Sequence, residues 1–414
     1  MRRSLIALAA AVAVASASLT VIPAAQAAGP LPEPAFGMHV PQIANGADPS
    51  VRYGSIRMWD SGITWGQVQQ KKNVFWWNGF DAAIANANEQ GANVMYVLGS
   101  TPTWAASNKK QGTYPNKGAA SVPKMKDWKN WVEAVTKRHG DSIESYQIWN
   151  EADLTNFWAG TPKQMADLTR EAAKIIRKND PTAKIVSASS TVRLESSYKR
   201  FFPKYLKALK KANWPVDVIA IHTYPSGQGT PADRVAYINQ AKNDMRKANV
   251  PASKPLWDTE INYGIPGPGS VRGQNINGAQ AAAWVAQTYL DNLLLGVERS
   301  YWYFWAPADG RVGINLQDGT TGAVGFQTVN KWLAGSYYDC GTTSGTNVCQ
   351  MGDNNNPESV AWVTSGSGTY TVPNGATVQC DALNTCTAVT PGSRVTIGSM
   401  PLWFGTPAGQ AGNQ

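Results

Sequence analysis

Histidine and cysteine are scarce in this chain of 414 residues, which contains three histidines and four cysteines. The cysteines form no Cys-x-x-Cys pair, and zinc in proteins is held mainly by these two residue types. The sequence therefore argues against a metal site, and we expect no cofactor.

Charged side chains are also few, at 16% of residues, although the formal net charge is +9. The lysines are scattered over expected helices, such as residues 204–211, where a solvated face is the ordinary interpretation. Nucleic acid is therefore not an expected partner. The oligomeric state stays open.

Long apolar runs are absent beyond the first residues of the chain. There, Arg2 and Arg3 precede an alanine-rich apolar run over residues 5–22, and residues 25–27 form an Ala-x-Ala pattern. A charged start, an apolar middle and a small-residue end are typical of a secretory signal peptide, here residues 1–27. We expect the rest of the chain to be secreted and not embedded in a membrane.

All four cysteines, Cys340, Cys349, Cys380 and Cys386, lie in the last 75 residues. An even number of cysteines in an exported chain indicates disulfides. Three pairings are open. The two local pairs, Cys340 with Cys349 and Cys380 with Cys386, would each staple a hairpin or a short loop.

Strand-like and helix-like segments alternate over residues 33–333. Eight short apolar or β-branched runs are candidate strands: 36–40, 55–59, 93–98, 144–149, 184–188, 216–221, 254–260 and 299–305. Eight strand–helix units predict an α/β fold, a (β/α)₈ TIM barrel. An open doubly wound sheet would need a glycine-rich phosphate turn after the first strand, and residues 37–40 are not one.

The composition changes after the predicted barrel. Residues 335–406 are rich in Gly, Thr, Ser, Val and Asn and contain short alternating runs, such as 359–364 and 369–372. This pattern predicts a small C-terminal antiparallel β domain, stapled by the disulfides. Residues 407–414 are expected to be a disordered tail.

Two carboxylates stand where the chemistry of a TIM barrel is usually found, at the C-terminal ends of strands. Glu151 follows the fourth predicted strand directly after Asn150, and Glu260 ends the seventh. Strands four and seven lie on opposite sides of an eight-stranded barrel, so the two side chains should face each other across its mouth. Two carboxyl groups about 5–5.5 Å apart suit cleavage of a glycosidic bond by double displacement.

The same segments resemble known enzymes. Residues 146–151 (YQIWNE) and 255–260 (PLWDTE) resemble the strand-four and strand-seven signatures of clan A glycoside hydrolases. Residues 36–40 (FGMHV), 56–60 (IRMWD) with Trp65, and 99–105 (GSTPTWA) resemble glycoside hydrolase family 39 and related bacterial endoglycosidases. The similarity spans roughly residues 36–333, and it implies a retaining glycosidase with a carbohydrate substrate.

The resemblance also implies roles for individual residues. Glu151 would be the acid/base and Glu260 the nucleophile. Asn150 would bind the sugar 2-hydroxyl, and Arg57 would keep Glu260 ionised. The other expected substrate-binding residues are His222 and Tyr224 beside the nucleophile, Trp305 as the sugar platform, and Trp59 and Trp104, with Trp65, Trp158 and Trp302 as further aromatic candidates. His39 would either reach a sugar hydroxyl from the first strand or plug the floor of the barrel.

Asp258 departs from the expected pattern. It precedes Glu260 by two residues, so strand alternation predicts that both side chains point the same way. A second carboxylate one layer deeper would pair with a buried cation or hydroxyl, or raise the pKa of Glu260 by like-charge repulsion.

Two other functions fit this fold. A carbohydrate-binding protein on a degenerate barrel would need a broken acid pair, and a metal-dependent hydrolase would need more histidines at strand ends. The glycan itself stays open, because the long loops 101–121 and 262–277 would build either an open cleft or a closed pocket.

Overall fold

The computed structural model describes residues 30–267, 270–306, 311–352 and 357–407. The expected signal peptide and residues 408–414 of the expected tail lie outside this range. None of the described helices is both long and apolar enough to cross a membrane.

Eight parallel strands form the first part of the chain, in the order β5-β4-β3-β2-β1-β8-β7-β6. Bridges from Val186 to Val218 and from Thr191 to His222 join the outer strands β5 and β6 and close the barrel. The predicted α/β barrel is confirmed, with each predicted strand present in shorter or shifted form. The strands are β1 Phe36–Met38, β2 Ser55–Met58, β3 Asn93–Val97, β4 Ser145–Gln147, β5 Lys184–Val186, β6 Ile219–His222, β7 Leu256–Ile261 and β8 Val297–Trp302.

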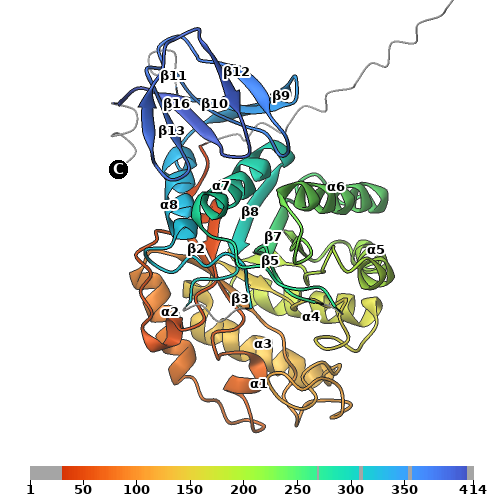
Figure 1. Cartoon of the computed structure of the whole chain (residues 1–414). Helices are drawn as coiled ribbons and strands as arrows, with labels where there is room; N and C mark the ends of the chain where they lie inside the picture. Colours follow the sequence, from red (N-terminus) through yellow and green to blue (C-terminus); the bar gives the residue numbers. More distant parts are fainter. Residues whose placement is uncertain (1–29, 268–269, 307–310, 353–356, 408–414) are drawn as a thin grey trace, which may run out of the picture.

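Helices cover the outside of these strands (Figure 1). In α4, Thr161 and Gln164 form the capping box that satisfies the first free N–H groups, and the apolar stripe from Met165 to Ile176 is buried. The main helices are α2 Asn78–Glu89, α3 Met125–His139, α4 Pro162–Asn179, α5 Glu195–Lys211, α6 Pro231–Ala248, α7 Gly278–Leu295 and α8 Thr321–Leu333; α1 Trp65–Val68 and the 3-10 turns η1 Glu33–Ala35, η2 Ile43–Asn45 and η3 Gly140–Ser142 are short.

Strand β7 contains an irregularity that decides which way its acids point. Asp258 pairs with Ile221, whereas the next residue of β6, His222, pairs with Glu260, so Thr259 is an extra residue. Asp258 consequently faces the helices, where its carboxylate binds Arg234 of α6 over 2.9 Å and the Thr223 hydroxyl. Gln147 of β4 binds Thr259 across the barrel over 3.1 Å. The expectation that Asp258 and Glu260 point the same way is wrong, because a bulge interrupts strand alternation.

The C-terminal segment forms antiparallel sheets, as predicted. One sheet has the order β14-β13-β16-β11-β10-β9, and β12 pairs with β15 in a second. The strands are β9 Tyr338–Thr343, β10 Thr346–Gly352, β11 Pro357–Trp362, β12 Gly368–Thr371, β13 Val378–Asp381, β14 Cys386–Ala388, β15 Arg394–Ile397 and β16 Leu402–Gly405.

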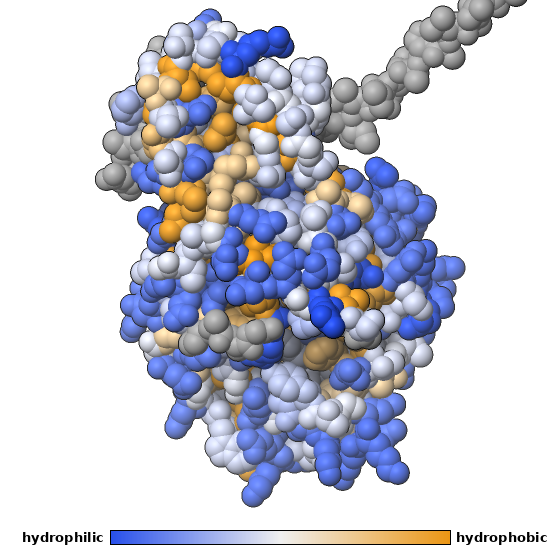
Figure 2. All heavy atoms as spheres, viewed as in Figure 1, coloured by the Kyte–Doolittle hydropathy of each residue, from blue (hydrophilic) through white to orange (hydrophobic). Residues whose placement is uncertain are grey.

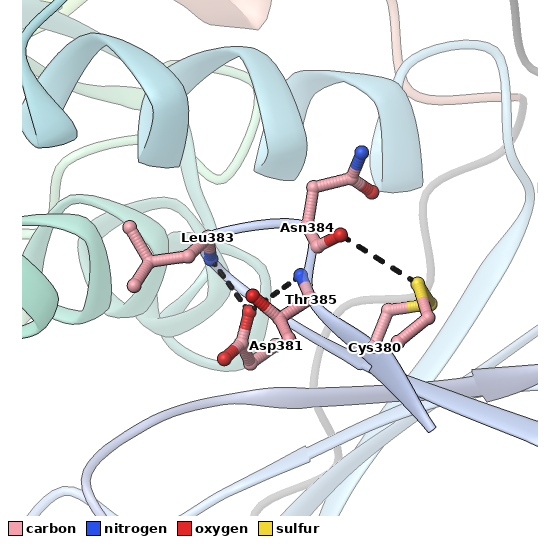
Figure 3. Close-up of a disulfide and its surroundings, with 6 residues drawn as sticks. Cys380, Asp381, Leu383, Asn384 and Thr385 are labelled. Carbon is pink, nitrogen blue, oxygen red and sulfur yellow. Dashed lines mark hydrogen bonds between the residues drawn. A yellow bond between two sulfur atoms is a disulfide. The ribbon is translucent and has the colours of Figure 1, made fainter. Parts of the chain in front are cut away.

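Both disulfides are local. Cys340 joins Cys349 across β9 and β10, and Cys380 joins Cys386 across β13 and β14. In the second hairpin, the Asp381 carboxylate accepts bonds from the backbone N–H groups of Leu383 and Thr385, both over 2.9 Å (Figure 3). The turn is therefore held by a side chain as well as by the disulfide that closes it.

The β sheets sit on helices α7 and α8 (Figure 1). Gln287 of α7 donates to the Val363 carbonyl over 3.1 Å, and the Trp362 indole donates to Asp291 of α7 over 2.8 Å. Buried residues of the sheets, including Trp362 and Trp403, belong to the same apolar cluster as the helix layer of the barrel. On the face shown in Figure 2, hydrophilic side chains cover most of the barrel, and apolar ones gather over the β sheets.

Candidate active site

A cleft of about 360 Å³ opens at the C-terminal ends of the barrel strands. Its walls are formed mainly by polar and aromatic side chains, with a few aliphatic ones, from the strand ends and the loops that follow them. They include Trp59, Asp60, Tyr114, Asn150, Glu151, Phe157, Thr191, Arg193, His222, Tyr224, Glu260, Ile265, Tyr303 and Arg311.

Glu260 is held from two sides. Arg57 Nη1 donates to Glu260 Oε1 over 2.5 Å, and the Tyr224 hydroxyl donates to Oε2 over 2.8 Å. Only 5% of Glu260 is exposed, and Arg57 is fully buried. The carboxylate is thus fixed in orientation and lies beside a permanent positive charge.

Arg57 connects three strands below the cleft. Its Nε donates to Gln147 Oε1 and its Nη2 donates to Asn150 Oδ1, both over 2.7 Å. Because Arg57 occupies all these acceptors at once, the planar guanidinium sets the positions of Asn150 and Glu260 relative to each other.

Glu151 has a different environment. Its backbone has a φ of 41°, in the left-handed region that is costly for residues other than glycine. The Glu151 N–H donates to Ser189 Oγ over 2.9 Å, which helps to hold this conformation. The side-chain oxygen Oε1 lies 3.1 Å from His222 Nδ1.

The two carboxylates and His222 meet in one place. One oxygen of each glutamate and a ring nitrogen of His222 all lie within 4.8 Å of one another. His222 Nδ1 is 3.4 Å from Glu260 Oε2, so it bridges the acids. Among the described residues this trio is the group that could hold a metal ion. A cation there would lie close to Arg57 and would be repelled by it.

Glu151 and Glu260 differ in the groups that shift their pKa values. Burial raises the pKa of Glu151 to about 7, against a smaller lowering effect of Arg57 and Arg193. Burial also raises the pKa of Glu260, and the positive charge of Arg57 acts against it. Burial lowers the pKa of His222 to about 3, so its ring is neutral near pH 7. Glu260 has direct charged and hydroxyl donors and Glu151 has not, which favours a proton on Glu151.

Most expected site residues meet in this cleft, and Arg57 lies directly beneath it. His39 is buried deeper, with Nε2 at 3.1 Å from the Thr259 carbonyl, and it does not line the cleft. Trp104 also lies elsewhere, where its indole donates to the Gln69 carbonyl over 2.7 Å. Trp65, Trp158 and Trp302 are buried in the core.

Trp305, the expected sugar platform, is not in the cleft wall. Its indole donates to Asp318 Oδ1 over 3.1 Å. Strand β8 ends at Trp302, three residues before the predicted end, and the next aromatic ring, Tyr303, lines the cleft instead. The expected position was wrong because the strand end was placed too late.

Several polar residues of the cleft were not anticipated, among them Asp60, Tyr114, Arg193 and Tyr303. Asp60 accepts a bond from the Tyr114 hydroxyl over 2.7 Å and one from the Tyr303 hydroxyl over 2.5 Å, which links three loops. Arg193 lies on the loop after β5. Asp60 stands two residues beyond the end of β2, and this position is the one sequence signal that could have indicated it.

Comparison with known proteins agrees with the fold. A family model described as the glycosyl hydrolase catalytic core matches residues 73–316. A family 39 glycoside hydrolase from Bacteroides cellulosilyticus WH2 has a similar structure, with a TM-score of 0.66 and 15% identity over 91% of this chain and 81% of that chain. A GH39 β-xylosidase from Caulobacter crescentus gives a TM-score of 0.65 and 15% identity over 92% and 98%. At such identities the likeness shows the fold alone.

Two curated relatives come from Caldicellulosiruptor saccharolyticus. A β-xylosidase is 26% identical over 155 residues, which is 35% of this chain and 30% of the relative. A β-mannanase/endoglucanase A is 26% identical over 184 residues, which is 36% of this chain and 13% of the relative. The chain thus matches less than a third of either relative, whereas the family model covers more than half of this chain. The chain belongs to the glycosyl hydrolase catalytic-core family.

Proposed function

We propose that this chain is a retaining glycoside hydrolase that cleaves an oligo- or polysaccharide by double displacement. Glu260 attacks the anomeric carbon while the bond to the leaving oxygen breaks and Glu151 gives its proton to that oxygen. Glu151 then takes a proton from water, the water oxygen attacks the anomeric carbon, and Glu260 is released.

One observation carries the proposal: the short separation of the two acids. Oxygens of Glu151 and Glu260 lie within 4.8 Å of each other. Retaining enzymes have carboxyl groups about 5–5.5 Å apart, whereas inverting enzymes need about 6.5–9.5 Å to admit a water molecule. The separation here supports direct attack by a carboxylate.

The neighbouring residues support this division of labour. Arg57 and Tyr224 stabilise the ionised form of Glu260, which a nucleophile requires. Arg57 donates a hydrogen bond to Asn150 Oδ1, so the Asn150 amide nitrogen is the atom that would donate to a sugar 2-hydroxyl. His222, neutral and in contact with both acids, would keep them apart and in position.

Export and a carbohydrate substrate are parts of the same proposal. Residues 1–27 have the pattern of a signal peptide, and two disulfides suit an oxidising compartment. The aromatic rings of Trp59, Phe157 and Tyr303 in the cleft wall suit packing against sugar C–H groups. The names of the two curated relatives, a β-xylosidase and a β-mannanase/endoglucanase, are the reason to test xylan, mannan and glucan first.

The test is the release of reducing ends from a broad polysaccharide panel, by wild type and by Glu260→Ala and Glu151→Ala. Glu89→Ala, at an exposed site on α2, is the matched control. We expect wild type and control to cut at least one polymer and both active-site variants to lose at least about 10³-fold in rate. Equal activity of folded Glu260→Ala and wild type would contradict the proposal.

A further inference from the structure

Arg193 is a charged residue of the cleft wall that the double displacement does not use. It lies on the loop after β5. Its Nη1 donates to the Pro225 carbonyl over 3.0 Å and reaches the Ile265 carbonyl at 3.5 Å. The guanidinium is therefore held in place by the loops that follow β6 and β7.

No carboxylate of the described residues forms an ion pair with Arg193, whereas two fully buried arginines of the barrel each have one. Arg57 is paired with Glu260, and Arg234 is paired with Asp258. Arg193 is partly buried, and burial lowers its pKa. Removing a cation from water without a counter-ion is costly, and two carbonyl oxygens offset only part of that cost. An anionic group of a ligand would supply this counter-ion.

The place of Arg193 indicates which part of a substrate it would meet. Strand β5 neighbours β4, and the Ala152 N–H donates to the Ser189 carbonyl over 3.0 Å, which joins the loop of Glu151 to the loop after β5. Arg193 also acts electrostatically on Glu151. Because Glu151 is the proposed proton donor to the leaving oxygen, a group bound by Arg193 would belong to the leaving-group side of the bond that breaks.

We propose that the cleft accepts a glycan with a uronic acid on the leaving-group side, and that Arg193 binds its carboxylate. This inference rests on the proposed glycosidase function. A guanidinium presents parallel N–H groups that match the two oxygens of a carboxylate. With Nη1 fixed on backbone carbonyls, the remaining N–H groups of Arg193 are pre-organised for such a contact.

A purely structural role is the competing explanation, because the same bonds tie three loops together. The two explanations differ in what a substitution does to neutral substrates. Loss of a loop tie would slow the cleavage of all substrates alike, whereas loss of a carboxylate contact would slow only acidic ones.

The test uses polysaccharides that carry uronic acids, each paired with its carboxyl-reduced form, in which the carboxylate has become a hydroxymethyl group. kcat/KM is measured for wild type, Arg193→Gln and Arg193→Lys, with Arg200→Gln on the exposed face of α5 as the control. We expect wild type and control to prefer the acidic form by at least about tenfold. Arg193→Gln should lose this preference, keep its rate on the reduced form within about threefold, and unfold at the wild-type temperature.

Each other result has a defined meaning. Equal cleavage of acidic and reduced polymers by wild type, or equal loss on both by Arg193→Gln, overturns the inference and leaves the glycosidase function standing. Arg193→Lys retains the charge without the fork, so we expect an intermediate preference. If wild type cuts no acidic and no neutral polymer, the proposed function and the inference both fall.

Discussion

Arg57 does the most to organise the active site at the scale of single residues. It contacts Gln147, Asn150 and Glu260, which come from two different strands and a strand exit. A lysine would carry the same charge but would lack the planar fork that reaches three acceptors at once. The position of Glu260, the proposed nucleophile, therefore depends on the shape of the Arg57 side chain as well as on its charge.

We expect Arg57→Lys to lower kcat by about 10²-fold or more, because Glu260 and Asn150 lose their fixed positions. Arg52→Lys, on an exposed arginine paired with Glu33, is the matched control and should be unchanged. Steady-state kinetics with circular dichroism of both variants checks this. A folded Arg57→Lys enzyme with the wild-type kcat would contradict the role given to Arg57.

Glu151 should set the alkaline limit of activity. Its pKa of about 7 means that kcat/KM falls as pH rises through that value, because the general acid loses its proton. The acidic limb reports the protonation of Glu260. A pH–rate profile that stays flat up to pH 9 would show that Glu151 is not the acid.

The raised pKa of Glu151 also makes the free energy of unfolding depend on pH. The folded state raises the pKa from 4.5 to about 7, so it binds the proton more tightly than the unfolded state. This contribution is complete below pH 4.5 and is lost as pH rises through 7. We expect Glu151→Gln to unfold like wild type at pH 4 and to be more stable at pH 8, by up to about 3 kcal/mol. Thermal unfolding at both pH values checks this, and equal stability at pH 8 would contradict it.

The sequence allowed the centre of the site to be predicted but not its rim. Glu151 and Glu260 lie at or near the C-terminal ends of β4 and β7, which is where the fold class predicts a TIM-barrel site. Asp60, Arg193 and Tyr303 reach the cleft from loops, whose course depends on contacts distant in the sequence. Trp305 was misplaced because nothing in the apolar run 299–305 marks where hydrogen bonding to the neighbouring strands ends.

At the scale of elements, the bulge in β7 separates two acids that the sequence places two residues apart. Asp258 faces α6 and α7, where Arg234 also binds Asn292 over 2.7 Å, while Glu260 faces the cleft. Alternation predicts one direction for both side chains, and a single extra residue reverses that outcome. No residue type or pattern marks a bulge of this kind, so it could not be predicted from the sequence of Leu256–Ile261.

We expect Arg234→Met to cost about 3–5 kcal/mol of unfolding free energy, because it leaves Asp258 buried without its cation. Asp81→Asn breaks an exposed pair with Arg138 and should cost less than about 1 kcal/mol. Urea unfolding of both variants tests the contrast. Similar losses in the two variants would show that Asp258 is stabilised in another way.

At the scale of the whole molecule, the barrel and the C-terminal sheets share a core. The barrel and a C-terminal β domain were predictable from alternation and composition, but their contact was not, since Trp362, Gln287 and Asp291 meet only in the folded chain. The shared cluster implies that the two parts unfold together.

We expect calorimetry to show one cooperative transition. Trp362→Ala should shift that whole transition to lower temperature, with a loss of about 3–5 kcal/mol. Two separate transitions, with only the smaller one moved by the substitution, would show that the sheets fold independently of the barrel.

The most direct test of the central claim is the anomeric configuration of the first product, followed by NMR during the cleavage of a susceptible polysaccharide. Attack by Glu260, with Glu151 within 4.8 Å as the proton donor, predicts that the new reducing end appears first in the configuration of the cleaved bond. First appearance of the opposite anomer would show single displacement by water and would contradict the mechanism.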